Sequence, residues 1–288
     1  MSYIYAHKTE NSIKILSDTK VTINSNDLSR LKKRFSEKEY NNFLKYGFIK
    51  TVIYKPNITI SSAGEVEHFN ELLSFLYQNN INDITVIQNK ALEINVHYNR
   101  DTDFIITTEK EIFKVAEKKI QNVSSCWIGD EDANNEFAKF KEKVILPDIY
   151  YPEIVSESTK KIEKEAALID AAFSSLIDNP QINTVGGFVV RCIYENNTYK
   201  FLGNFIVSSS KSQVLNKNDV INFDSSRAEG GFSFISKESC DYYCGCFKQI
   251  NKCIIYKEGY SDNSYKYISM PYIIDNNENL WLKINNFK

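Results

Sequence analysis

Four of the six cysteines lie close together in the last fifth of the chain, where their spacing invites a metal-binding interpretation. Cys240, Cys244, Cys246 and Cys253 follow the pattern C-x3-C-x-C-x6-C. Thiolates are common zinc ligands, but structural zinc sites usually carry paired C-x2-C knuckles, which this pattern lacks. Cys244 and Cys246 share one face of a predicted strand, and Cys253 could lie across a turn. Because buried thiols pack as small hydrophobic side chains, we favour core packing and predict no metal site and no cofactor.

The histidines and the glycine pairs do not form a recognisable chemical motif. His7, His68 and His97 have no mutual spacing typical of a ligand set, and none lies beside a cysteine that could act as a nucleophile. The glycine pairs at 186–187 and 230–231 lack the G-x-x-x-x-G-K-[ST] pattern of a phosphate-binding loop. These residue types therefore give no reason to predict a nucleotide-binding protein.

Length and composition predict a globular chain without a strong electrostatic preference. Of its 288 residues, 42% are hydrophobic, and 35 basic against 37 acidic residues give a formal net charge of -2. That balance favours neither nucleic acid nor an anionic membrane as a partner. The first residues lack an apolar run fit for a signal peptide, and no stretch approaches the roughly 20 apolar residues of a membrane helix. We expect a soluble, cytoplasmic protein with reduced cysteines and no nucleic-acid or membrane partner.

The hydrophobic pattern predicts alternating blocks of strands and helices. Strands are predicted at residues 3–6, 13–17, 51–54, 58–61, 104–107, 111–115, 124–128, 188–194 and 199–207. Helices are predicted at residues 66–76, 88–94, 131–142 and 160–177, and a further helix or ordered loop within 27–46. Blocks in this order favour an α+β fold with two sheets packed face to face and helices outside.

Four segments of the chain occur in an order and at a spacing that match a known family. They are residues 2–6 (SYIYA) with 15–22 (ILSDTKVT), residues 50–64 (KTVIYKPNITISSAG), residues 104–130 ending in WIGD, and residues 184–190 (TVGGFVV). Together they resemble the proteasome β subunit and the peptidase subunit of the related bacterial ring protease. The resemblance covers roughly the first 210 of the 288 residues.

This resemblance implies an N-terminal-nucleophile (Ntn) hydrolase. The expected fold is a four-layer αββα sandwich over residues 1–208, followed by a mostly β C-terminal extension over 209–288 that has no recognised counterpart. In the family, an N-terminal residue supplies the nucleophile and its own α-amine acts as the base. Ser2 would take this part after removal of Met1 and cleave peptide or amide bonds through an acyl-enzyme. Because family members form rings, a homo-oligomer acting on a peptide or protein substrate is implied.

Two further residues match family positions that support the nucleophile. Asp18 lies at the spacing of the structural aspartate, and Lys50 lies where the active-site lysine sits. An ammonium near the amine would lower the pKa of that amine and stabilise a developing oxyanion. Without this chemistry, Ser2 is an ordinary second residue, Asp18 a turn cap and Lys50 a solvated residue at a strand start.

Some positions depart from the family pattern. Ser2 replaces the more usual Thr. Asp130 stands where the family has a supporting Ser, and we favour a role for it as the cap of the helix that follows over a catalytic one. Ile182 and Val185 stand where the family often has the Asp and Ser that orient the amine. The sequence therefore leaves two functions open. One is an active Ntn hydrolase, and the other is a non-catalytic scaffold or binding subunit of a cytoplasmic complex.

Overall fold

The structure of the protein is a computed structural model. It describes residues 2–10, 12–21, 49–146, 157–195 and 197–202, with backbone alone for 157–162, 200 and 202 and for the strands beyond residue 202. The helix or loop expected within 27–46 lies outside the described residues. No helix in the described part is long and apolar enough to cross a membrane.

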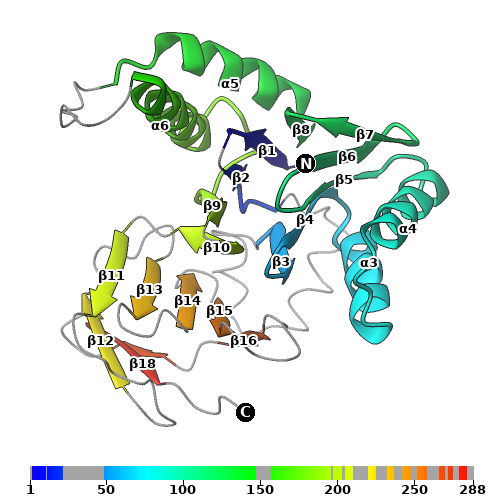
Figure 1. The fold of residues 1–288 in the computed structure, drawn as a ribbon. Coiled ribbons are helices and arrows are strands. Elements are labelled where there is room, and N and C mark those ends of the chain that lie inside the picture. Colours follow the sequence, from blue (N-terminus) through cyan, green and yellow to red (C-terminus); the bar gives the residue numbers. More distant parts are fainter. Residues whose placement is uncertain are drawn as a thin grey trace.

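The first sheet joins strands from the start, the middle and the end of residues 2–202 (Figure 1). Its order is β10-β9-β2-β1-β8, and every pair is antiparallel. In chain order its strands are β1 (Tyr3–Lys8), β2 (Ile13–Ser17), β8 (Ser125–Gly129), β9 (Val190–Glu195) and β10 (Thr198–Leu202). The prediction of one strand over 199–207 was wrong, since β10 ends at Leu202 and β11 (Phe205–Ser209) pairs elsewhere. Gly203 and Asn204, residue types that favour turns, separate the two.

The second sheet is an antiparallel meander in which each strand pairs with the next along the chain. Its strands are β3 (Thr51–Lys55), β4 (Ile58–Gly64), β5 (Thr102–Thr107), β6 (Ile112–Ala116) and β7 (Lys119–Val123). The sequence did not predict β7. This edge strand buries none of its residues fully, so it lacks the alternation of buried and exposed positions by which a strand is recognised.

Two pairs of helices separate the blocks of strands. They are α3 (Val66–Gln78) with α4 (Ile84–His97), and α5 (Glu131–Lys143) with α6 (Glu157–Ile177). The helix predicted over 88–94 is in the right place but too short. Asp83 caps α4 by accepting the backbone N–H of Thr85 at 2.8 Å, and Ile87, Ala91 and Ile94 are buried along one face.

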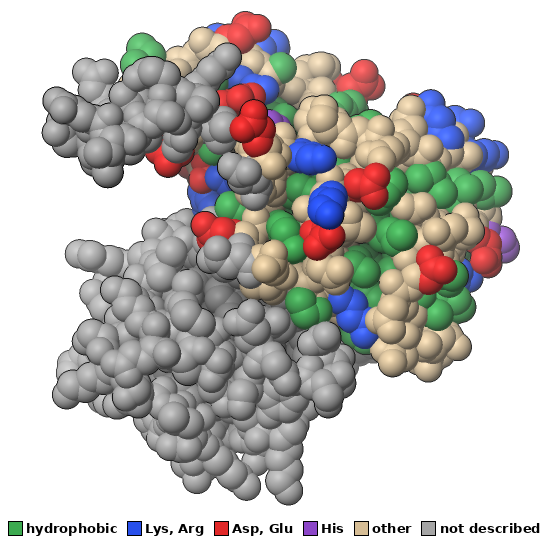
Figure 2. All heavy atoms as spheres, viewed as in Figure 1, with side chains coloured by type: hydrophobic (Ala, Val, Ile, Leu, Met, Phe, Trp, Pro, Cys, Tyr) green, Lys and Arg blue, Asp and Glu red, His purple; other side chains and the backbone are tan. Residues whose placement is uncertain are grey.

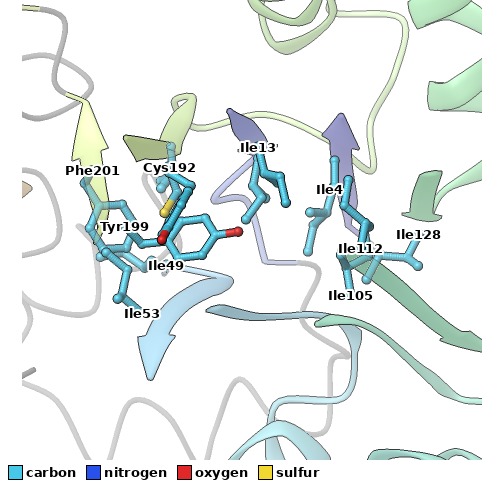
Figure 3. Close-up of a cluster of buried hydrophobic side chains, with 14 of the residues drawn as sticks. Ile4, Ile13, Ile49, Ile53, Ile105, Ile112, Ile128, Cys192, Tyr199 and Phe201 are labelled. Atoms are coloured by element: carbon cyan, nitrogen blue, oxygen red, sulfur yellow. The ribbon is translucent and has the colours of Figure 1, made fainter. Parts of the chain in front are cut away.

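Buried side chains show which layers touch. Ile4 and Ile13 of the first sheet belong to one apolar cluster with Ile53, Ile105 and Ile112 of the second (Figure 3). The outer face of the second sheet packs on α3 and α4, and the outer face of the first packs on α5 and α6 (Figure 1). The expected α+β class is confirmed.

The strands after residue 204 pair among themselves in two further sheets. Their orders are β11-β13-β14-β15-β16 and β12-β18-β17, with β11 and β13 parallel and the other pairs antiparallel. These strands are β12 (Val220–Asp224), β13 (Phe232–Ser236), β14 (Tyr242–Phe247), β15 (Lys252–Lys257), β16 (Lys266–Ser269), β17 (Tyr272–Ile274) and β18 (Asn279–Lys283). The division of the chain into domains at residue 208 stays a prediction.

Candidate functional site

Ser2 lies immediately before β1 and is 7% exposed. Its carbonyl accepts the backbone N–H of Asp130 at 2.8 Å, so the start of β1 is fixed to the end of β8. Gly129 makes this contact possible, because a Cβ built there would lie 1.8 Å from the Ser2 carbonyl oxygen. Its φ of +104° is also one that glycine adopts readily. The backbone of residue 2 is therefore held closely within the first sheet.

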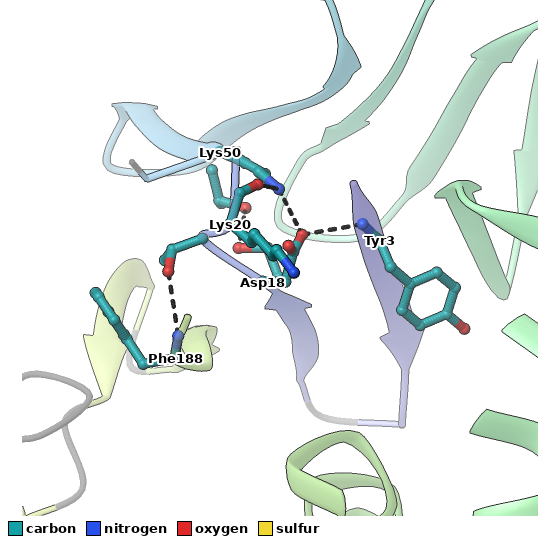
Figure 4. A network of polar contacts seen from close by, with 8 residues as sticks. Tyr3, Asp18, Lys20, Lys50 and Phe188 are labelled. Carbon is teal, nitrogen blue, oxygen red and sulfur yellow. Dashed lines mark hydrogen bonds and ion pairs between the residues drawn. The ribbon is translucent and has the colours of Figure 1, made fainter. Parts of the chain in front are cut away.

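Asp18 follows β2 and is fully buried. Its Oδ1 accepts the backbone N–H of Tyr3 at 2.9 Å and the ammonium of Lys50 at 2.7 Å (Figure 4). The Asp18 N–H in turn donates to the Tyr3 carbonyl at 3.2 Å. Both the carboxylate and the backbone N–H of Asp18 are thus hydrogen-bonded to Tyr3, the residue that follows Ser2.

Lys50 precedes β3 of the second sheet and is 1% exposed, so it is not the solvated strand-start residue that was the alternative. Besides Asp18, its ammonium donates to the backbone carbonyl of Lys20 at 2.6 Å. The Lys50 carbonyl accepts the N–H of Ser62 in β4 at 3.0 Å. The structure therefore brings Asp18 and Lys50 together beside the backbone of Tyr3, the neighbour of Ser2. That these groups act in catalysis stays a prediction.

Burial and ion pairing have opposite effects on the pKa values of Asp18 and Lys50. Burial lowers the pKa of Lys50 and raises the pKa of Asp18, because both charged forms lose hydration. The ion pair opposes both shifts, and the Tyr3 N–H further favours the carboxylate. The Gly186 N–H also helps to lower the pKa of Asp18, although Oδ2 has no partner with hydrogen-bond geometry among the described residues. The pair therefore depends on close contact to remain ionised.

The loop at Gly186 is attached to the segment after Asp18, a connection that sequence reasoning missed. The backbone N–H groups of Thr19 and Lys20 donate to the Gly186 carbonyl at 3.2 and 3.1 Å. The Thr19 hydroxyl accepts the N–H of Phe188 at 3.1 Å (Figure 4). Thr19 and Lys20 belong to the family-like segment ILSDTKVT, but no sequence signal indicates that they contact residues so distant in the chain.

Besides Ser2, three positions depart from the family pattern, and each of them has a packing or hydrogen-bond partner. The Asp130 carboxylate accepts the N–H of Ala133 at 2.8 Å and caps α5, as the helix-cap alternative expects. Val185 is 3% exposed and belongs to the apolar cluster between the first sheet and α5 and α6, and Ile182 packs against that cluster. Neither apolar side chain can orient an amine by hydrogen bonding.

The cysteine cluster falls on neighbouring strands. Cys246 of β14 is the register partner of Cys253 of β15, and Cys244 lies two residues before Cys246. Core packing of these thiols stays a prediction, because their side chains lie outside the described part. Among described residues, no group of three or more His, Cys, Asp or Glu could hold a metal ion. On the face shown in Figure 2, acidic and basic side chains are interspersed over the described surface.

Comparisons with known proteins find a likeness among solved structures but none among family models or curated proteins. No protein-family model matches the chain, and no curated protein matches it. Among solved structures, the chain is similar to "Anbu (Gly-1) mutant from Hyphomicrobium sp. strain MC1", with a TM-score of 0.47 and 14% sequence identity. The match covers 70% of this chain and 86% of that chain. A likeness of this size carries no functional argument, so function has to be argued from the contacts described above.

Proposed function

We propose that the chain is a divergent Ntn hydrolase of the proteasome-β-like kind, which cleaves peptide or amide bonds with Ser2 as nucleophile after removal of Met1. The layer order supports the corresponding fold. Two sheets share an apolar cluster, and a helix pair covers the outer face of each, as in a four-layer αββα sandwich. A homo-oligomer and a peptide or protein substrate belong to the same proposal.

The observation that carries the proposal is the buried contact of Asp18 with both Lys50 and Tyr3. A buried ion pair seldom adds net stability, because the lost hydration of two charges offsets their attraction. Buried titratable groups with shifted pKa values and a specific charge partner are common at functional sites. The Tyr3 N–H reports the location of Ser2, since it belongs to the peptide bond that joins the two residues.

Ser2 and Lys50 have distinct roles in the proposed reaction. The Ser2 hydroxyl attacks the substrate carbonyl, and its proton passes to the liberated α-amine of the same residue. The Lys50 ammonium donates one hydrogen bond to the Asp18 carboxylate and one to the Lys20 carbonyl. Its third N–H has no partner among the described residues. That N–H and the positive charge favour the neutral amine and the developing oxyanion. The amine then protonates the leaving group, and water hydrolyses the acyl-serine.

A non-catalytic scaffold or binding subunit is the second candidate. It is favoured by Ile182 and Val185, which pack against or within an apolar cluster where the family often has polar residues that orient the amine. In this alternative the Asp18–Lys50 pair has a structural function only.

Intact-mass measurement followed by electrophile labelling tests the proposal. We expect Met1 to be absent from the purified protein, and an epoxyketone, which reacts with an adjacent amine and hydroxyl, to add one equivalent. Ser2→Ala should abolish this addition, because it removes the hydroxyl. Ser124→Ala, at an exposed serine, is the matched control and should label like the parent protein.

Two results would reject Ser2 as the nucleophile of a hydrolase. One is a retained Met1, which leaves residue 2 without a free amine. The other is labelling that persists in Ser2→Ala, which assigns the reactive group to another residue.

A further inference from the structure

A chain of buried hydroxyl groups connects the two sheets next to the ion pair. The Thr51 hydroxyl donates to the Ser17 hydroxyl at 3.3 Å and shares a hydrogen bond of 2.9 Å with the Ser61 hydroxyl. All three residues are fully buried. Ser17 ends β2 in the first sheet, whereas Thr51 and Ser61 are register partners on β3 and β4 in the second. The hydroxyl chain therefore crosses between the sheets.

The hydroxyl chain runs beside the charged groups in sequence as well as in space. Ser17 precedes Asp18, and Thr51 follows Lys50, so each end of the cross-sheet hydrogen bond adjoins one member of the ion pair. Displacement of β2 relative to β3 would therefore stretch both contacts together.

Hydroxyl groups at this position need an explanation, because most of the surrounding inter-sheet layer is apolar. Ile53, Ile105 and Ala63 are buried in the same layer, and an alanine or valine could replace a hydroxyl there without an unsatisfied polar atom if both partners changed. Apolar contacts are not directional, so they tolerate small sliding of one sheet over the other. Hydrogen bonds weaken steeply with distance and angle, so they fix the relative position of the strands that carry them.

We propose that Thr51 is a positioning residue that, through Ser17 and Ser61, holds Lys50 within contact distance of Asp18. Its importance for catalysis rests on the proposed hydrolase function, but its effect on the ion pair does not. Thr51 touches neither the nucleophile nor the substrate in this proposal, and it acts only through the separation of the two charges.

A second pair of buried threonines provides a matched control. The hydroxyls of Thr59 and Thr107 share a hydrogen bond of 2.6 Å, and both residues are fully buried. They are register partners on β4 and β5, so their bond lies within the second sheet and does not cross to the first. Thr51→Val and Thr59→Val therefore remove the same group from buried positions. Of the two hydroxyls removed, only that of Thr51 is itself hydrogen-bonded to a residue of the first sheet.

Titration of the Lys50 side chain by NMR, with 13C-labelled lysine and Lys50→Met for assignment, tests the proposal. In Thr51→Val we expect the midpoint of Lys50 to move to lower pH by about one pH unit, because a longer distance to Asp18 weakens the attraction that keeps the ammonium charged. Thr59→Val should leave the midpoint unchanged while losing a similar amount of thermal stability. Thr51→Ser, which restores the hydroxyl, should return the midpoint to that of the parent protein.

An unchanged midpoint in Thr51→Val, or an equal shift in both valine variants, would overturn the positioning role. If Thr51→Val does not fold, Ser17→Ala removes the partner hydroxyl instead. It should move the Lys50 midpoint to lower pH, and an unchanged midpoint would overturn the positioning role in the same way. The epoxyketone labelling rate separates this inference from the proposed function. A shifted midpoint in a protein that never labels supports the positioning role while rejecting the hydrolase.

Discussion

At the scale of single residues, the site depends on a charge pair that neither partner could maintain alone. Asp18 and Lys50 are almost completely shielded from water, and each is the principal counter-charge of the other. Loss of one partner leaves an uncompensated charge in the protein interior, whereas loss of both leaves a neutral and more apolar site. Removal of the second charge should therefore restore part of the stability that removal of the first one costs.

Asp18→Asn is expected to lower the free energy of unfolding by about 3–5 kcal/mol, the usual effect of breaking a buried pair. The double variant Asp18→Asn with Lys50→Met should recover a large part of this loss, because it also removes the buried ammonium. Urea unfolding of both variants measures the difference. If the double variant is as unstable as the sum of the two single variants, the two charges are not coupled.

At the scale of elements, the site is an assembly of strand ends. Ser2 precedes β1, Asp18 follows β2, Lys50 precedes β3 and Gly129 ends β8. In antiparallel pairs the start of one strand lies beside the end of the next, so the start of β1 and the ends of β2 and β8 lie together at one end of the first sheet. The ion pair joins that end of the sheet to the start of β3 in the second sheet.

Gly129→Ala should damage this junction more than Gly186→Ala. Both glycines have positive φ, so either substitution strains the backbone, by roughly 1–3 kcal/mol. At Gly129 the new Cβ would also meet the backbone carbonyl of Ser2, whereas at Gly186 its nearest neighbour is the flexible side chain of Lys20, at 3.2 Å. Thermal unfolding of the two variants tests this order, and equal losses would show that the close approach of β8 to residue 2 contributes nothing.

At the scale of the whole molecule, the interior keeps several acidic side chains neutral. Burial raises the pKa of Cys126 to about 12, and burial also raises the pKa values of Cys192, Tyr3 and Tyr199. In the unfolded chain a thiol ionises near pH 8.5, the ordinary pKa of a cysteine. The folded state therefore holds these protons at a pH where the unfolded state has released them.

This difference predicts a loss of stability in alkali. A raised folded-state pKa contributes stability that is complete below the unfolded value and is lost as pH rises toward the folded value. We expect the free energy of unfolding to be steady up to about pH 8.5 and then to fall by about 1.4 kcal/mol per pH unit for each such thiol. Urea unfolding between pH 7 and 10.5 measures the slope. Cys126→Ala should make it shallower, and an unchanged slope in this variant would show that the Cys126 thiol is not responsible.

The sequence by itself determined the order of strands and helices, because the periodicity of apolar residues is a local property of the chain. It also singled out Asp18 and Lys50, though only through a family resemblance. It missed β7, whose residues stay partly exposed, and it extended a strand past Leu202 because nothing local shows that β11 pairs with a different sheet.

Only the tertiary structure decided which groups meet. The contact of Asp18 with Lys50, the hydroxyl chain through Thr51 and the attachment of Thr19 to the Gly186 loop all join residues distant in sequence. Two of these contacts also cross from one sheet to the other. Such contacts depend on how two sheets stack and in which register, and apolar patterning fixes which face of a strand is buried without fixing what that face touches.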